Sequence, residues 1–241
     1  MLTPKELPDN IRLAYEDEII DWLFATKAII LDAKRRFHFQ SAYPELFDYP
    51  CPPLYLDESV FQSDPIHRQL VVALLLDRVA RMQLHFQKVA GVADSAIPMA
   101  IILSEQLDIG HIWVLKEPKV SGTERHIEGI YKPEETVLTY DNAFSTGDSV
   151  VKHFKKVRLE KLAAQVVLGI IDYDIGSGYS FLEQRIWGNP LFTVKRFVDR
   201  LIKLNHITKR KGVTVVDYFE VLRPIIEPLI AQKWANDPGR D

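Results

Sequence analysis

Residues 137–149 combine an apolar run, an acid and a turn of small, hydroxyl-bearing residues. The run ends at Asp141, and Ser145, Thr146 and Gly147 lead into a segment with a helical pattern. The first N–H groups of a helix lack partners and carry partial positive charge, so such a turn can bind an anion. An acid at the strand end can bind ribose hydroxyls or a metal-bridged group. The pattern suggests a sugar-phosphate site, although an ordinary strand-to-helix connection also uses Asp and Ser as turn and cap residues.

The elements that would position this segment alternate between strands and helices. Strands are expected at 88–92, 111–115, 135–140 and 166–172, with helices at 97–106, at 149–158 and in a second stretch to about Gln165. This alternation predicts an α/β fold with a mainly parallel twisted sheet flanked by helices. Ligands bind such sheets beyond the carboxyl ends of the strands. The polar segments 93–98, 116–126 and 141–149 are expected there.

Outer segments complete the predicted organisation. The patterns favour a helix at 16–34, an irregular aromatic and proline-rich stretch at 37–56, a helix at 66–85 that Asp64 and Pro65 begin, and helices at 194–204 and 215–233, the last broken near Pro224. We expect residues 1–65 to form an N-terminal helix and hood, 66–205 the core and 206–241 a C-terminal helical extension.

Composition excludes several classes of protein. With 241 residues and 47% hydrophobic content, the chain can bury a full core. A net charge of -3 gives no sign of a basic surface that would bind nucleic acid. Its single cysteine, Cys51, excludes an internal disulfide framework and a cysteine-rich zinc site. The sequence shows no signal-peptide pattern and no run that could span a bilayer, so we expect a cytoplasmic protein without a membrane partner.

Four segments resemble the type I phosphoribosyltransferases, and among them the orotate phosphoribosyltransferases of pyrimidine biosynthesis. They are residues 37–42 with 51–57 downstream, 91–100, 115–122 and 137–149, in family order. The resemblance implies a type I phosphoribosyltransferase-like core that transfers ribose 5-phosphate from phosphoribosyl pyrophosphate (PRPP) to a nitrogenous base. For orotate the product is orotidine 5'-phosphate, and pyrophosphate is released with help from Mg²⁺. The resemblance also implies a homodimer with sites shared between subunits.

The resemblance assigns roles to particular residues. Lys116 and Lys119 of the charged loop would meet the pyrophosphate, and Asp141 would hold the ribose hydroxyls, which makes these three the expected catalytic residues. Gln40 and, after the last core strand, Tyr173 and Asp174 are expected at the base, although a buried structural role is the alternative for Tyr173. The residues expected along PRPP are Asp94, Ser95, Ala96, Asp141, Asn142, Ala143, Phe144, Ser145, Thr146, Gly147, Asp148 and Ser149.

Several loop positions depart from the family pattern. Leu115 and Ser121 replace a cation and a histidine, for which Arg125 and His126 are candidate substitutes. Asn142 replaces one of two neighbouring carboxylates. Because these replacements fall on residues expected to take part in the reaction, they motivate an alternative function. In that alternative the chain is a catalytically degenerate protein of this fold that binds a phosphoribosyl ligand or acts as a regulatory subunit.

Three further departures introduce acids near the expected substrates. Asp94 stands where the pyrophosphate loop normally has glycine or lysine. Asp148 stands in the phosphate loop, and we expect it to face solvent as a first-turn acid rather than to repel the phosphate. Asp174 aligns with an arginine that would meet the orotate carboxylate, so it favours a neutral or cationic base unless it only forms a turn with Gly176 and Gly178.

Overall fold

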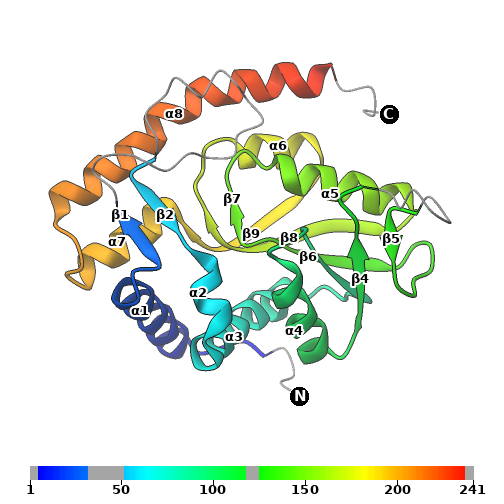
Figure 1. Ribbon diagram of the computed structural model, residues 1–241, viewed down its shortest axis with the longest axis horizontal. Coiled ribbons are helices and arrows are strands. Elements are labelled where there is room, and N and C mark those ends of the chain that lie inside the picture. The colour runs from blue at the N-terminus through cyan, green and yellow to red at the C-terminus, as the bar shows by residue number, and fades with distance from the viewer. Residues whose placement is uncertain (1–4, 32–51, 118–124, 237–241) are drawn as a thin grey trace.

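A central sheet organises the chain in the computed structural model, which describes residues 5–31, 52–117 and 125–236 (Figure 1). In this part of the chain the sheet has seven strands in the order β5-β4-β3-β6-β8-β7, with β9 also paired to β8. Its strands are β3 (Lys88–Gly91), β4 (Gly110–Val114), β5 (Ile127–Glu128), β6 (Thr136–Tyr140), β7 (Ala143–Phe144), β8 (Ala163–Asp172) and β9 (Trp187–Thr193).

All pairings in this sheet are parallel except β4 with β5. Strands of a parallel sheet are covered on both faces, which explains why Val89, Leu138 and Val167 are fully buried. The carboxyl ends of β3, β4, β6 and β8 therefore meet at one edge. This arrangement confirms the predicted fold class, a mainly parallel sheet flanked by helices.

Helices cover both faces of the sheet (Figure 1). Helices α3 (Pro65–Met82) and α4 (Ile97–Leu107) lie on one face, and α5 (Asp148–Leu159) and α6 (Ser177–Glu183) lie on the other. Asp64 caps α3 as expected, because its carboxylate accepts the His67 N–H at 2.9 Å. No helix in the described ranges is both long and apolar enough to span a membrane.

The N-terminal segment differs from its prediction. Helix α1 (Asp9–Ala25) ends well before residue 34, and the chain enters strand β1 (Ile29–Leu31), which pairs with β2 (Leu54–Leu56) ahead of α2 (Glu58–Ser63). Lys27 adopts a left-handed φ of 61°, which ends the helical path, and the β-branched residues that follow favour a strand. Helix α1 packs against α3.

The region after α5 also differs. No second helix follows residue 159, because β8 begins at Ala163 and pairs with Thr136 of β6. Burial alternates over residues 163–166, which is the period of a strand. The sequence patterns did not predict α6 or β9, although both lie beside the phosphate loop described below.

The C-terminal segment forms α7 (Val194–Lys203) and a single long helix, α8 (Lys209–Ala235). The predicted break near Pro224 is wrong, since α8 contains both Pro224 and Pro228. Ile226 and Ile230 are fully buried, so tertiary packing holds the helix together where proline removes a backbone donor. Helix α8 packs against α6 and α7 and crosses the same side of the sheet as α5 (Figure 1).

Candidate functional site

The predicted phosphate loop lies between β6 and α5 and requires glycine at one position. Gly147 precedes α5 with a φ of 83°, which an L-residue with a side chain rarely adopts. A Cβ built at Gly147 would lie 2.9 Å from the Phe181 ring and 3.1 Å from the Ser180 Cβ. Both contacts belong to α6, so this short helix determines how closely the loop packs.

Helix α6 also supports the loop through hydrogen bonds. The Ser180 hydroxyl donates to the Thr146 carbonyl at 2.6 Å, and the Ser177 N–H donates to the Ser145 carbonyl at 3.0 Å. These bonds occupy carbonyls of the loop and fix its backbone ahead of α5, whose first N–H groups have no partner within the helix. The loop is therefore held in place at the helix start where the sequence predicts a phosphate site.

Asp148, the first residue of α5, does not face solvent as expected. It is only 7% exposed, and its carboxylate accepts a hydrogen bond from the Thr146 hydroxyl at 3.2 Å. The Lys233 ammonium of α8 lies 2.5 Å from the other carboxylate oxygen. The expectation was wrong because it considered only α5, whereas the partner of Asp148 comes from a helix 85 residues further along the chain.

The segment after β3 meets the phosphate loop. The Asn142 amide donates to the Ser95 hydroxyl at 3.1 Å, which joins the loops that follow β6 and β3. Asn142 is buried, and its Oδ1 has no hydrogen-bond partner among the described residues. Ala96 approaches Gly91 so closely that a Cβ at Gly91 would lie 2.8 Å from the Ala96 carbonyl group. Glycine is therefore required at position 91, where β3 ends against the backbone of this loop.

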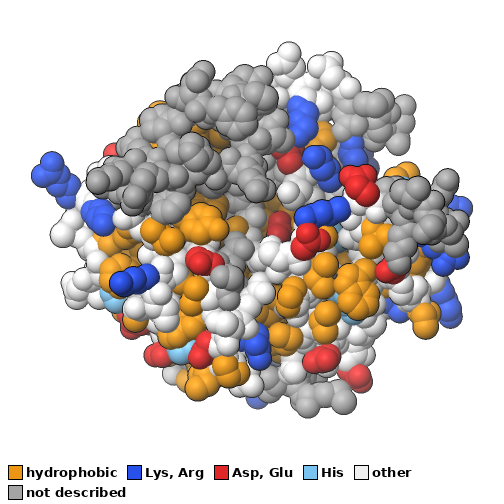
Figure 2. Space-filling view, in the orientation of Figure 1, with side chains coloured by type: hydrophobic (Ala, Val, Ile, Leu, Met, Phe, Trp, Pro, Cys, Tyr) orange, Lys and Arg blue, Asp and Glu red, His pale blue; other side chains and the backbone are white. Residues whose placement is uncertain are grey.

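The charged loop after β4 reaches the same place. The Lys116 ammonium lies 2.5 Å from the Asp94 carboxylate, and both side chains are largely exposed. The three segments that the sequence placed at strand ends are thus linked by two side-chain contacts, Asn142 to Ser95 and Lys116 to Asp94. Figure 2 shows that acidic and basic side chains lie side by side on this face.

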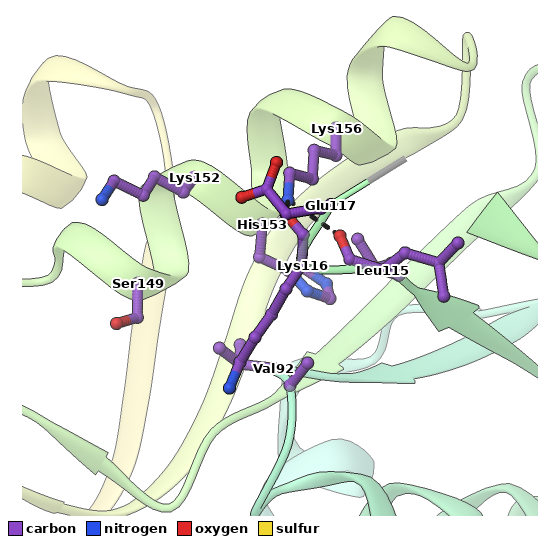
Figure 3. A pocket seen from close by; sticks show the side chains of 10 residues that line it. Val92, Leu115, Lys116, Glu117, Ser149, Lys152, His153 and Lys156 are labelled. Carbon is purple, nitrogen blue, oxygen red and sulfur yellow. Dashed lines mark hydrogen bonds between the residues drawn. The ribbon is translucent and has the colours of Figure 1, made fainter. Parts of the chain in front are cut away.

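A pocket of about 250 Å³ opens between the ends of β3 and β4 and helix α5. Lys116 extends along it toward Val92, and Ser149 and Lys152 line it from α5 with their side chains pointing away from Lys116 (Figure 3). Lys156 also lines the pocket, but its ammonium is bonded to the carbonyls of Leu115 and Lys116. Three lysines and one acid, Glu117, therefore line the pocket, which gives it a net positive lining.

His153 forms part of the pocket wall and is buried. Its pKa is lowered to about 3, mainly by burial and to a smaller extent by nearby Lys156. Its ring lies 3.4 Å from the Thr139 hydroxyl of β6. At neutral pH it is therefore an uncharged group that joins α5 to the sheet.

At the end of β8, the residues expected near the base have structural partners. Tyr173 is 4% exposed and stacks on Phe219 of α8, which fits the alternative of a buried tyrosine. Asp174 has a φ of 55° and forms an ion pair with Arg223, whose Nε donates to the Asp174 carbonyl at 2.8 Å. Asp174 thus forms a turn and is also neutralised by α8.

Asp172 lies beside this turn and was not predicted. The pKa of Asp172 is raised to about 6, because burial outweighs the opposing hydrogen bonds from the Ser177 hydroxyl at 2.7 Å and the Asp174 N–H at 2.8 Å. The Ser177 bond fixes the start of α6. Asp172 therefore connects the end of β8 to the helix that supports the phosphate loop.

Some expected site residues lie outside the described residues, namely Gln40, Lys119 and Ser121. Of the candidates for the missing cation, His126 is held by backbone bonds to Leu115 and to the Glu160 carboxylate, and Arg125 is exposed. The sequence reasoning missed Lys233 and Arg223. The only available signal was their position on a helix whose apolar residues recur at 222, 226, 230 and 234.

The strand order and the three loops at one sheet edge define the class of protein, the phosphoribosyltransferase fold. The chain matches the structure of UMP synthase from Leishmania donovani with a TM-score of 0.71 and 21% identity, covering 85% of this chain and 42% of that one. It matches orotate phosphoribosyltransferase from Aeropyrum pernix with a TM-score of 0.64 and 22% identity, covering 78% and 99%. These likenesses establish the fold.

Sequence comparison identifies the family within this fold. The chain is 31% identical to the orotate phosphoribosyltransferase of Lactiplantibacillus plantarum over 153 residues, which are 63% of this chain and 70% of that protein. The chain belongs to the orotate phosphoribosyltransferase family. No protein-family model matches it.

Proposed function

We propose that this protein transfers the ribose 5-phosphate group from PRPP to orotate and releases pyrophosphate. The observation that carries the proposal is the meeting of three loops at one sheet edge, through the contacts of Asn142 with Ser95 and of Lys116 with Asp94. Three loops of this kind can hold the phosphate, the ribose and the pyrophosphate of one substrate. The activity of the family relatives supports the same reaction class.

Each loop has a part in the proposed reaction. The N–H groups at the start of α5, with Ser145 and Thr146, hold the 5-phosphate. Asp141 accepts hydrogen bonds from the ribose hydroxyls, and residues 93–96 lie along the pyrophosphate. Lys116, together with the predicted Lys119, stabilises the negative charge that develops on the departing pyrophosphate. The protein thus positions two substrates and balances charge, which suits a reaction through an oxocarbenium-like state.

Orotate is compatible with the base end of the site. The objection from sequence was that Asp174 would repel the orotate carboxylate. In the structure Arg223 neutralises Asp174, so the pair presents no net charge to an anionic base. We retain orotate as the acceptor, and Gln40 remains a predicted contact.

We propose Mg²⁺ as the metal that accompanies PRPP. Among the described residues no three His, Cys, Asp or Glu side chains cluster as a protein-only metal site would require. Mg²⁺ usually binds through one or two oxygen ligands of the protein together with substrate phosphates. Asp141 and the buried, unpartnered Oδ1 of Asn142 are oxygen ligands of that kind. Bound there, Mg²⁺ would offset charge on the pyrophosphate.

The remaining expectations belong to the same proposal. A homodimer in which the charged loop of one subunit serves the other would supply cations beyond Lys116. We also expect the protein to act in the cytoplasm, in pyrimidine biosynthesis, with no nucleic-acid or membrane partner. Equilibrium sedimentation of the purified chain measures its oligomeric state directly.

Incubation with PRPP, Mg²⁺ and a panel of bases that includes orotate tests the activity. Pyrophosphate release with orotate is expected, and D141N should lower kcat/KM by at least about tenfold, the effect of losing a charged hydrogen-bond acceptor. D217N, on the exposed face of α8, is the matched control. PRPP binding without turnover on any base would favour the degenerate binding protein instead.

A further inference from the structure

Helix α8 carries two cations to two of the acids that depart from the family pattern. Lys233 pairs with Asp148 in the phosphate loop, and Arg223 pairs with Asp174 beyond β8. The helix belongs to the segment that the sequence suggested was only an extension. Lys233 and Arg223 therefore contact two segments that are predicted to bind the substrate.

The end of α8 is held against the phosphate loop by a continuous set of contacts. The Trp234 indole N–H lies 3.4 Å from the Ser180 hydroxyl, which donates to the Thr146 carbonyl at 2.6 Å. Trp234 is 3% exposed, and the Lys233 ammonium lies over its ring, 5.0 Å from the centroid. The position of Lys233 therefore depends on the same residues that support the loop.

The contact between α8 and α6 leaves little freedom for this helix. Gly176, at the start of α6, has a φ of 133°, and a Cβ there would lie 2.3 Å from the Ile230 side chain. Ile226 and Ile230 are fully buried against this contact. Tight packing at this crossing sets how far the last turns of α8 reach toward the loop.

Asp148 places a carboxylate where a phosphate dianion would enter. The carboxylate is buried, and one oxygen already accepts from Thr146. A buried negative charge next to an anion weakens binding unless a cation compensates for it. Lys233 provides that cation from a helix that lies outside the loop.

We propose that Lys233 is a positioning residue for the phosphoribosyl substrate. It neutralises Asp148 and holds the Asp148 carboxylate toward α8, so that the N–H groups at the start of α5 can receive the 5-phosphate. This inference rests on the proposed function. Because Lys233 acts through Asp148, the two residues should show strong coupling in a double-mutant cycle.

Calorimetric titration of the full chain with PRPP and Mg²⁺, together with steady-state kinetics, tests the proposal. In K233M the Kd and KM for PRPP should rise by at least about tenfold, with kcat changed much less, because a buried charge loses its partner. D148N/K233M should recover most of the affinity, and K233R should remain close to wild type. K211M, exposed at the start of the same helix, is the matched control.

Two outcomes would overturn the inference. In the first, K233M binds PRPP as tightly as wild type; a lower melting temperature in that case would indicate a structural role alone. In the second, D148N/K233M stays as weak as K233M, which would show that Lys233 does not act through Asp148. If wild type itself fails to bind PRPP, the proposed function fails first.

Discussion

Replacing Asp172 by asparagine is expected to change how the stability of the chain depends on pH. Burial raises the pKa of Asp172 from 3.8 to about 6. The Asp172 carboxyl therefore keeps its proton to a higher pH in the folded chain than in the unfolded chain. Its favourable contribution to the free energy of unfolding is complete below pH 3.8 and is lost as the pH rises to about 6.

The size of the effect follows from these two values. At about 1.4 kcal/mol for each pH unit between them, ionising the buried carboxyl costs about 3 kcal/mol of folding stability. Asparagine cannot ionise, and its Oδ1 can still accept the hydrogen bonds from Ser177 and Asp174. D172N should therefore match wild type near pH 4 and exceed it by up to about 3 kcal/mol at pH 7.

Urea unfolding of both proteins at several pH values between 4 and 8 measures this difference directly. At pH 7 the melting temperature of D172N should also be higher by several degrees, since about 1 kcal/mol corresponds to roughly 2–4 °C in a chain of this size. D217N, at an exposed site, should show no such pH-dependent gain. If the stability difference between D172N and wild type stays constant from pH 4 to 8, or shrinks as the pH rises, the raised pKa of Asp172 is refuted.

Three other substitutions test neighbouring features. Burial lowers the pKa of His153 to about 3, so the free energy of unfolding of wild type should fall by about 2 kcal/mol between pH 6.5 and pH 5, whereas that of H153Q should not. Urea unfolding measures this difference, and an equal fall in both proteins would contradict the prediction. G147A should destabilise by roughly 1–3 kcal/mol in thermal unfolding and weaken PRPP binding, whereas G178A, where a Cβ has open space, should do neither. D94N should free Lys116 and strengthen pyrophosphate inhibition by up to about fivefold, an effect that high salt should reduce.

Much of the core could be predicted from sequence because its signals are local. Strands β3, β4 and β6 and helices α4 and α5 lie within one or two residues of their predicted bounds. Apolar runs mark strands that are buried on both faces, and small polar residues mark the turns that follow them. The three loops could therefore be placed at one sheet edge before any coordinates were known.

Elements that depend on distant partners were missed or misjudged. Strand β9 contains Gly188 and Pro190, which weaken its local strand pattern, and it forms because it pairs with β8 along most of its length. Helix α8 continues through Pro224 because buried isoleucines on one face compensate for the lost donor. In both cases tertiary packing outweighs local preference.

The fold family and the three strand-end loops could be predicted from the sequence, because backbone turns and parallel strands leave short-range patterns. The role of the acids in those loops depends on long-range packing. Asp148 and Asp174 are neutralised by Lys233 and Arg223, which lie 85 and 49 residues away along the chain. The charge that a substrate meets depends on distances in space, which spacing along the chain does not reveal.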